Sequence, residues 1–156
     1  MKLFSNAVKD TIVIGKIIAR NAKKGDIICL FGNFGSGKTV LTKGIAEGLG
    51  VDEKNIVSPS FVLLREYLKA RIPLFHFDLY RLKDPKDILD IGYEEYLFGE
   101  GVTVIEWADR LNSLKPEEFL SINLSVKGSS KRQLVFKAYG NHHKALLRKI
   151  HEDIIN

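Results

Sequence analysis

The sequence is poor in the residues on which several classes of protein depend. Its 156 residues include a single cysteine, Cys29, which excludes an internal disulfide and every zinc site built from several cysteines. No apolar run approaches the ~18 residues that a membrane-spanning helix needs. Residues 1–5 also lack the apolar stretch of a secretory signal. We therefore expect a reduced, cytoplasmic protein with no membrane among its partners.

The rest of the composition is that of a globular protein. Apolar residues make up 45% of the chain and charged residues 28%. A chain of this length buries enough surface for a core of its own. Because no internal repeat, low-complexity block or linker is visible, we expect one domain over residues 1–156.

Charge is unevenly distributed along the chain. The net charge is +5, but residues 1–44 carry +6, residues 45–118 carry −6 and residues 119–156 carry +5. Such a pattern is compatible with a bipolar surface that meets RNA on one side and a protein on the other. It is equally compatible with charges that only keep the chain in solution, as is usual for charged helix faces.

Hydrophobic periodicity predicts interleaved helices and strands. The expected helices span residues 6–22, 38–49 and 85–98, with a basic amphipathic helix at the end of the chain. The expected strands span residues 27–31, 61–67, 74–78, 102–105, 119–126 and 132–139, and the last two form a hairpin. Ser5 or Asn6 is expected to cap the first helix. The predicted fold class is α/β, with a mixed, partly parallel central sheet flanked by helices, plus a C-terminal β-hairpin and helix.

The most specific motif lies between the first buried strand and the helix after it. Residues 32–39 read GNFGSGKT and match G-x-x-x-x-G-K-[ST] at every position, which predicts a P-loop NTPase domain. Backbone amides of such a loop, together with the helix N-terminus, bind phosphate groups. The expected nucleotide contacts come from Phe34, Gly35, Ser36, Gly37, Lys38 and Thr39. Lys38 would bind the β- and γ-phosphates, and the Thr39 hydroxyl would ligate Mg²⁺.

The identity of the nucleotide follows from a missing motif. GTP-specific proteins usually carry Asn-Lys-x-Asp, and no Asn-Lys pair occurs in this chain. We therefore expect ATP, with Mg²⁺ as the only metal.

Two acidic residues end predicted strands beside the loop. Asp78 follows residues 74–77 and Glu106 follows residues 102–105. Both should emerge at the carboxyl edge of the sheet, where ligands bind in such folds. A helix cap or a surface ion pair is the ordinary alternative for a lone acid, but less so for two acids that each end a buried strand.

Four segments together resemble the bacterial TsaE (YjeE) ATPases, which take part in making threonylcarbamoyladenosine in tRNA. They are the GNFGSGKT loop, SPSF at 58–61, HFDLYR at 76–81 and EW at 106–107, in the order and spacing of that family. The resemblance implies that Lys38 and Thr39 serve phosphate and Mg²⁺. It also implies that Asp78 positions or activates the hydrolytic water and that Glu106 sits at Mg²⁺. The family's Ser-Pro-Thr switch segment reads Ser-Pro-Ser here, and Ser60 keeps the hydroxyl without the methyl.

Further residues have both a functional and an ordinary interpretation. Thr11 and Arg132 could reach the adenine end of the nucleotide, or they could be simple surface positions. Arg81 could sense phosphate or pair with neighbouring acids. Trp107 is expected in the core more than at a partner surface. Cys29 should be a buried, unreactive thiol. His142 and His143 begin the last helix without the spacing of a metal site.

The function implied by the resemblance is a slow ATPase that serves the t6A (threonylcarbamoyladenosine) modification of tRNA. Its partners would be TsaB and TsaD, and TsaD would carry out the transfer to adenosine. The sequence has no recognisable RNA-binding module, so tRNA would be an indirect partner, and no DNA is expected. One alternative is a small-molecule kinase with Arg65, Arg71 and Arg81 in a closing lid. The other is a nucleotide-binding module that signals without hydrolysis.

Overall fold

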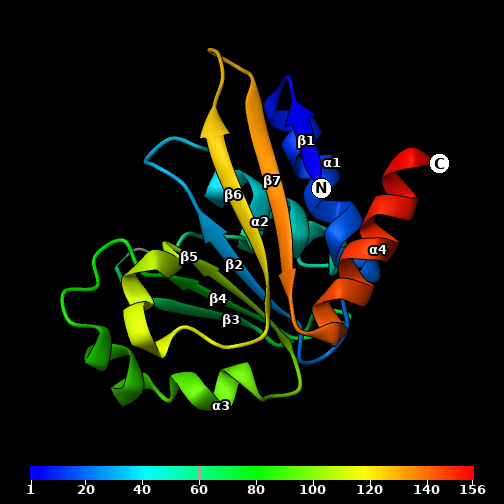
Figure 1. Ribbon diagram of the computed structural model, residues 1–156. Helices are drawn as coiled ribbons and strands as arrows, with labels where there is room; N and C mark the ends of the chain where they lie inside the picture. Colours follow the sequence, from blue (N-terminus) through cyan, green and yellow to red (C-terminus); the bar gives the residue numbers. More distant parts are fainter. Residues whose placement is uncertain (60) are drawn as a thin grey trace.

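The computed structural model describes residues 1–59 and 61–156, which form one mixed sheet with helices on both faces (Figure 1). The strands are β1 (Lys2–Ser5), β2 (Ile27–Phe31), β3 (Leu64–Tyr67), β4 (Leu74–Asp78), β5 (Val102–Glu106), β6 (Phe119–Val126) and β7 (Arg132–Tyr139). The α-helices are α1 (Val8–Asn21), α2 (Lys38–Gly48), α3 (Tyr93–Leu97) and α4 (Asn141–Ile155). Three 3₁₀ helices, η1 (Glu53–Asn55), η2 (Pro85–Ile91) and η3 (Ala108–Leu114), complete the elements.

The sheet has seven strands in the order β1-β7-β6-β2-β5-β4-β3. Its centre is parallel, because β2 pairs in parallel with β5 and β6, and β5 pairs in parallel with β4. β1, β3 and β7 run antiparallel to their neighbours. The predicted α/β class with a mixed, partly parallel sheet and a C-terminal hairpin and helix is therefore confirmed.

Each face of the sheet buries its own hydrophobic cluster. α1, α2 and α4 cover one face, with Ile18, Ile45 and Ile150 fully buried against the strands. η2, α3 and η3 cover the other face, where Phe77 and Tyr93 meet edge to face with ring centroids 5.7 Å apart. The central strands are buried on both sides, as their uninterrupted apolar runs predict.

α1 and α2 approach closely because small residues face one another. A Cβ atom added to Gly15 would lie 2.6 Å from the carbonyl oxygen of Leu41 and 2.8 Å from the Cα atom of Gly44. Backbone atoms cannot move aside as a flexible side chain can. This contact fixes the axis of α2, whose first residue is Lys38 of the phosphate-loop motif.

Three local predictions differ from the structure. Residues 2–5, for which no element is predicted, form β1 on the edge of β7. The expected helix over 85–98 is two shorter elements, η2 and α3, because the chain turns at Gly92 with a φ of 75°. The strand expected from residue 61 begins only at Leu64.

The start of α1 also differs from the prediction. The N-cap position is Ala7, and its side chain makes no capping hydrogen bond. Ser5 instead lies buried in β1, where its hydroxyl is 2.6 Å from the hydroxyl of Thr11. Asn6 uses its backbone N–H, which donates to Asp10 Oδ2 at 2.9 Å. The expected side-chain cap is therefore absent, and an acid in the first turn of α1 instead accepts a backbone N–H from the residue before the N-cap.

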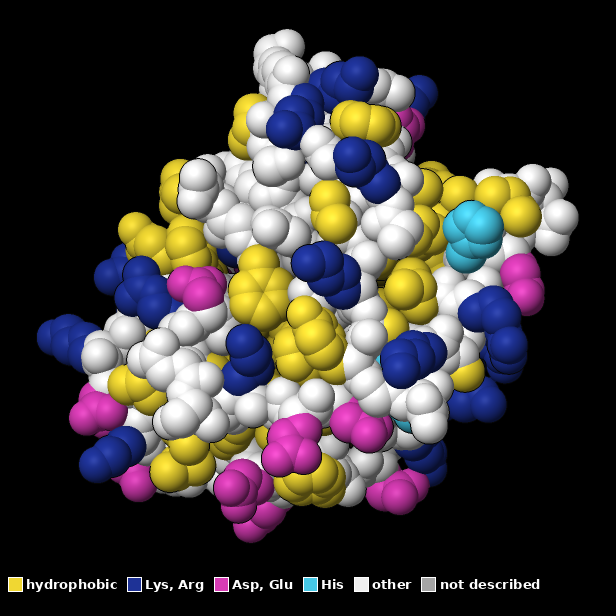
Figure 2. All heavy atoms as spheres, viewed as in Figure 1, with side chains coloured by type: hydrophobic (Ala, Val, Ile, Leu, Met, Phe, Trp, Pro, Cys, Tyr) yellow, Lys and Arg dark blue, Asp and Glu magenta, His cyan; other side chains and the backbone are white. Residues whose placement is uncertain are grey.

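Charge is segregated in space as well as along the sequence. Figure 2 shows acidic side chains gathered along the lower edge of the molecule, where Figure 1 places α3. Asp87, Asp90, Glu94 and Glu95 are exposed in this region. None of the helices that the structure describes has the length and apolar character needed to cross a bilayer.

Candidate functional site

The glycine-rich loop joins the end of β2 to the start of α2. Gly37 is the N-cap of α2 with a φ of 102°, a conformation that a side chain would strain, and Gly32 and Gly35 also have positive φ. The N–H of Ser36 donates to the carbonyl of Asn33 at 3.1 Å and closes a turn within the loop. The strand, loop and helix thus have the arrangement that the motif requires for phosphate binding.

The Lys38 side chain folds back over this loop. Its Nζ donates to the carbonyl oxygens of Gly32 at 2.7 Å and Asn33 at 3.0 Å, and it lies 3.8 Å from the centroid of the Trp107 ring. Burial lowers the pKa of the Lys38 amine, whereas the nearby carboxylates of Glu106 and Asp78 act in the opposite direction. The ammonium is therefore held at the centre of the loop by groups that an anionic ligand could replace.

Thr39 and Glu106 meet across the loop. The Thr39 hydroxyl donates to Glu106 Oε2 at 2.9 Å, and only 1% of Glu106 is exposed. A hydroxyl beside a carboxylate offers only hard oxygen donors, the kind that Mg²⁺ prefers. The residues present therefore fit a magnesium ion.

Asp78 ends β4 next to Glu106, which ends β5. The two residues are partners in the parallel register, and both are buried. Asp78 Oδ1 accepts the backbone N–H of Tyr80 at 3.1 Å, and Oδ2 accepts the Ser58 hydroxyl at 3.2 Å. The two acids therefore lie side by side at one edge of the sheet, as the sequence predicts.

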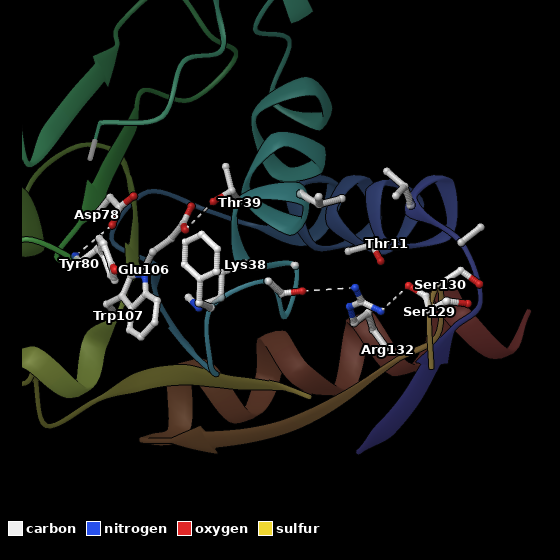
Figure 3. Close-up of a pocket in the computed structure, with 16 residues that line it drawn as sticks. Thr11, Lys38, Thr39, Asp78, Tyr80, Glu106, Trp107, Ser129, Ser130 and Arg132 are labelled. Atoms are coloured by element: carbon white, nitrogen blue, oxygen red, sulfur yellow. Dashed lines mark hydrogen bonds between the residues drawn. The ribbon is translucent and has the colours of Figure 1, made fainter. Parts of the chain in front are cut away.

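These groups border a cavity of about 460 Å³. Figure 3 shows that its labelled residues form two groups: Asp78, Tyr80, Glu106, Trp107, Lys38 and Thr39 in one, and Thr11, Ser129, Ser130 and Arg132 in the other. The volume lies within the range of small-molecule sites. Its described lining residues are Ala7, Val8, Thr11, Phe34, Gly35, Gly37, Lys38, Thr39, Val40, Asp78, Tyr80, Glu106, Trp107, Ser129, Ser130 and Arg132.

The far end of the cavity brings together segments that are distant in sequence. Arg132, at the start of β7, donates to the carbonyl of Gly35 at 3.3 Å and so ties the hairpin to the loop. Thr11 is 2% exposed and bonds to Ser5, so it borders the cavity as a buried residue of α1 rather than as a surface position. Both residues flank the loop in the arrangement on which their expected adenine role depends.

Several lining residues were not among the predicted contacts. Ala7, Val8, Val40, Tyr80 and the serines of the hairpin turn border the same cavity. Val8 is 63% exposed, and an exposed apolar residue at the start of a helix gives little signal in a sequence. Trp107, expected mainly in the core, is half-buried and lines the cavity with a φ of 57°, its ring centroid 5.1 Å from that of Tyr80.

Other candidate residues are not among the described lining residues of the cavity. The predicted role of Ser60 falls outside the described residues. Ser36 is buried in the loop with its hydroxyl 3.5 Å from Lys38 Nζ. Arg81 stacks on the Phe61 ring, with 4.4 Å from the guanidinium carbon to the centroid. Cys29 is fully buried, and burial raises the pKa of its thiol, in keeping with an unreactive cysteine.

The two histidines at the start of α4 meet an acid that their sequence spacing does not reveal. His142 Nε2 lies 2.6 Å from Asp26 Oδ1, and the Ile27 N–H donates to His143 Nε2 at 3.1 Å. The ligand atoms of Asp26, His142 and His143 lie within 4.8 Å of one another. These hydrogen bonds fasten α4 to the start of β2.

The fold and the site define a nucleotide-binding protein of the P-loop NTPase class. A family model described as "Threonylcarbamoyl adenosine biosynthesis protein TsaE" matches residues 5–134. The chain belongs to the TsaE family, and this confirms the resemblance seen in its motifs.

Individual relatives match along most of the chain. It is 39% identical to the tRNA threonylcarbamoyladenosine biosynthesis protein TsaE of Bacillus subtilis over 150 residues, which cover 95% of this chain and 93% of that protein. It is 40% identical to the protein of the same name from Treponema pallidum over 134 residues, covering 86% and 98%. The crystal structure of Bacillus subtilis YdiB superposes with a TM-score of 0.83 at 34% identity, covering 98% of this chain and 95% of that one.

Proposed function

We propose that the protein binds ATP with Mg²⁺ in this cavity, hydrolyses it slowly, and thereby serves the threonylcarbamoyladenosine modification of tRNA in the cytoplasm. One observation carries the proposal. A single cavity runs from the Thr39–Glu106 pair, past the phosphate-loop motif, to Thr11 and Arg132. The names of the relatives give the pathway that such a nucleotide site would serve.

The proposed binding mode follows from the lining residues. The triphosphate lies on the amides of residues 34–39, and Lys38 exchanges its carbonyl partners for phosphate oxygens. Thr39 and Glu106 hold Mg²⁺, which, when bound, neutralises phosphate charge and polarises the phosphoryl group. The base lies toward Thr11 and Arg132, where the cavity wall includes the apolar side chains of Val8 and Val40.

Asp78 is the residue that we assign to the hydrolytic water. Its carboxylate borders the same end of the cavity as Glu106, and its backbone and side-chain partners hold it in place. The hydrogen bond from Ser58 connects this carboxylate to the SPSF segment. Phosphate at the site would therefore affect the order of that segment, a switch that a partner can sense.

The proposed partners are TsaB and TsaD, and the transfer of the threonylcarbamoyl group belongs to TsaD. A protein that supplies only nucleotide-driven conformational change needs no acceptor pocket for adenosine or threonine. Arg65, Arg71 and Arg81 would have to reach the cavity in a kinase lid, but none is among its described lining residues. Arg71 donates instead to the carbonyl of Ala19 at 2.7 Å. These contacts favour the accessory ATPase over the kinase.

Phosphate release from MgATP tests the proposal. The protein is assayed alone and with purified TsaB and TsaD, beside the variants Lys38→Ala and Glu106→Ala and the control Lys43→Ala, a lysine of the same helix that pairs with Glu53 outside the cavity. We expect slow release that the partners accelerate, that both site variants abolish and that the control retains. Release that ignores the partners, or ATP consumption that needs an added small-molecule acceptor, would contradict the proposal and favour the kinase. Tight ATP binding without release would favour a non-catalytic module.

A further inference from the structure

His76 lies inside the protein and contacts Glu106. It is the third residue of β4, 1% exposed, and its Nε2 lies 2.8 Å from Glu106 Oε1. Because a carboxylate oxygen accepts, the imidazole nitrogen carries the hydrogen and donates. His76 is the first residue of the HFDLYR segment, but it is not among the described lining residues of the cavity.

The register of the sheet explains how this side chain reaches the site. β4 and β5 are parallel neighbours, in which His76 is opposite Val104 and Asp78 is opposite Glu106. Side chains two residues apart in a strand share a face, so His76 lies on the face that carries Asp78 and Glu106. Leu74 and Val104 on this face belong to the cluster beneath α1 and α2, whereas Phe75 and Phe77 lie on the opposite face.

A histidine at this buried position lowers the stability of the fold. Its Nδ1 is buried and has no hydrogen-bond partner in the part of the chain that the structure describes. A buried polar atom left unpaired destabilises the fold, whereas a leucine of similar size would pack against the apolar neighbours without that cost. Packing therefore does not account for His76, whose side chain hydrogen-bonds to Glu106 and to no other described residue.

That hydrogen bond restricts the carboxylate of Glu106. A glutamate has three rotatable side-chain bonds, and one contact from Thr39 leaves the carboxylate free to swing around it. The second contact, from His76 to the other oxygen, fixes the plane of the carboxylate with Oε2 directed at Thr39. Partners behind metal ligands hold them in orientation in this way, and their loss typically weakens metal binding 10–100-fold.

We propose that His76 is a positioning residue that holds the Glu106 carboxylate for Mg²⁺. The inference rests on the proposed nucleotide function and adds a residue to it. His76 touches neither the nucleotide nor the metal and acts only through Glu106. Loss of His76 should therefore change how strongly nucleotide affinity depends on Mg²⁺, and it should leave nucleotide affinity without Mg²⁺ unaffected.

Three substitutions separate this role from a packing role. His76→Leu removes the donor and keeps an apolar side chain, and His76→Asn keeps an amide that is too short to replace Nε2. His76→Gln places an amide N–H near the position of Nε2, so it can donate to Glu106. The matched comparison is between Asn and Gln, which differ in reach alone.

The readout is the affinity for a fluorescent ATP analogue, measured without Mg²⁺ and across a Mg²⁺ titration at one fixed pH. We expect the Mg²⁺ concentration at the midpoint to rise at least tenfold in His76→Leu and His76→Asn, and to stay within about threefold of the unsubstituted protein in His76→Gln. Affinity without Mg²⁺ should be unchanged in all three. In a Glu106→Gln background, adding His76→Leu should cause no further shift.

Other outcomes overturn the inference. Unchanged midpoints in His76→Leu and His76→Asn would show that Glu106 needs no support, and failure of all three variants to fold would show a packing role. A further shift in the Glu106→Gln background would mean that His76 acts by another route. If the unsubstituted protein itself shows no effect of Mg²⁺ on nucleotide affinity, the proposed function fails instead.

Discussion

Thr39 Oγ1 and Glu106 Oε2 lie 2.9 Å apart, although 67 residues separate them in sequence. Thr39 is the second residue of α2 and Glu106 is the last residue of β5, so the contact joins the phosphate-loop motif to the carboxyl edge of the sheet. The hydrogen bond brings the two expected metal ligands together before any ion is present. Mg²⁺ would then bind with little rearrangement of the protein.

The substitution Thr39→Val should separate metal binding from nucleotide binding. Valine keeps the shape of threonine but lacks the hydroxyl that faces Glu106. We expect ATP affinity without Mg²⁺ to be nearly unchanged and partner-stimulated phosphate release to fall at least tenfold. Thr103→Val is the control for loss of a threonine hydroxyl, because Thr103 is a buried residue of β5 whose hydroxyl donates to the carbonyl of Tyr96 instead. Equal losses in both variants would contradict the role of Thr39.

Trp107 should report nucleotide binding through its fluorescence. It is the only tryptophan in the sequence, and the ammonium of Lys38 lies 3.8 Å from its ring centroid. If Lys38 moves to phosphate, the charge over the indole ring changes and so should the emission. We expect a saturable change on titration with ATP. Lys38→Met should abolish it, whereas Lys43→Met should retain it, and a signal that survives in Lys38→Met would contradict this account.

Acid should weaken the attachment of α4. Burial lowers the pKa of His143 from its ordinary value, an effect that Asp26 opposes, and the neutral ring accepts the Ile27 N–H. The unfolded chain therefore binds a proton that the folded chain excludes, so stability is present above about pH 6.5 and is lost as the pH falls below it. The neighbouring His142 also lowers the pKa of His143, whereas Glu118 raises it.

Urea unfolding at pH 7.5 and pH 5.5 measures this effect. From pH 7.5 to pH 5.5, we expect the free energy of unfolding to fall less in His143→Gln than in the unsubstituted protein, because glutamine cannot take up a proton. His151→Gln, at an exposed position of the same helix, is the control and should leave the difference as it was. A pH dependence that His143→Gln does not alter would contradict the assignment.

Gly15→Ala should destabilise the fold although alanine favours helices. The new Cβ would meet backbone atoms of Leu41 and Gly44, and overpacking of this kind typically costs about 1–3 kcal/mol after side chains adjust. This exceeds the gain of up to ~1 kcal/mol in helix propensity. Thermal unfolding should show a lower midpoint for Gly15→Ala and little change for Gly128→Ala, where the nearest atom would be at 3.5 Å. A midpoint that rises in Gly15→Ala would show that α1 and α2 can separate freely.

The parts of the fold that the sequence predicts well are those with a strong local signal. The buried strands Ile27–Phe31 and Leu74–Asp78 and the hairpin of β6 and β7 were predicted with the bounds that the structure has. β1 was not predicted, because four residues that alternate weakly become a strand only when β7, more than 120 residues away, offers them an edge. Gly92 divides the expected third helix, a break that its hydrophobic pattern hides.

The site shows the same division. The phosphate-loop motif and the acids that end β4 and β5 could be predicted from the sequence, because residue spacing and strand ends suffice to locate them. The contact from His76 to Glu106 could not be predicted from the sequence, because it depends on which strand lies beside β5 and in which register. Likewise Asp26 meets His142 only through the packing of α4 against the start of β2. Long-range pairing is the information that a single sequence gives least directly.

A crystal structure with Mg²⁺ and a non-hydrolysable ATP analogue tests the central claim most directly. We expect the metal about 2.0–2.1 Å from Thr39 Oγ1 and beside Glu106, with the phosphates on the amides of residues 34–39. Lys38 should have left the carbonyls of Gly32 and Asn33, and the base should lie toward Thr11 and Arg132. Nucleotide bound elsewhere on the protein, or a metal that touches neither Thr39 nor Glu106, would contradict the account.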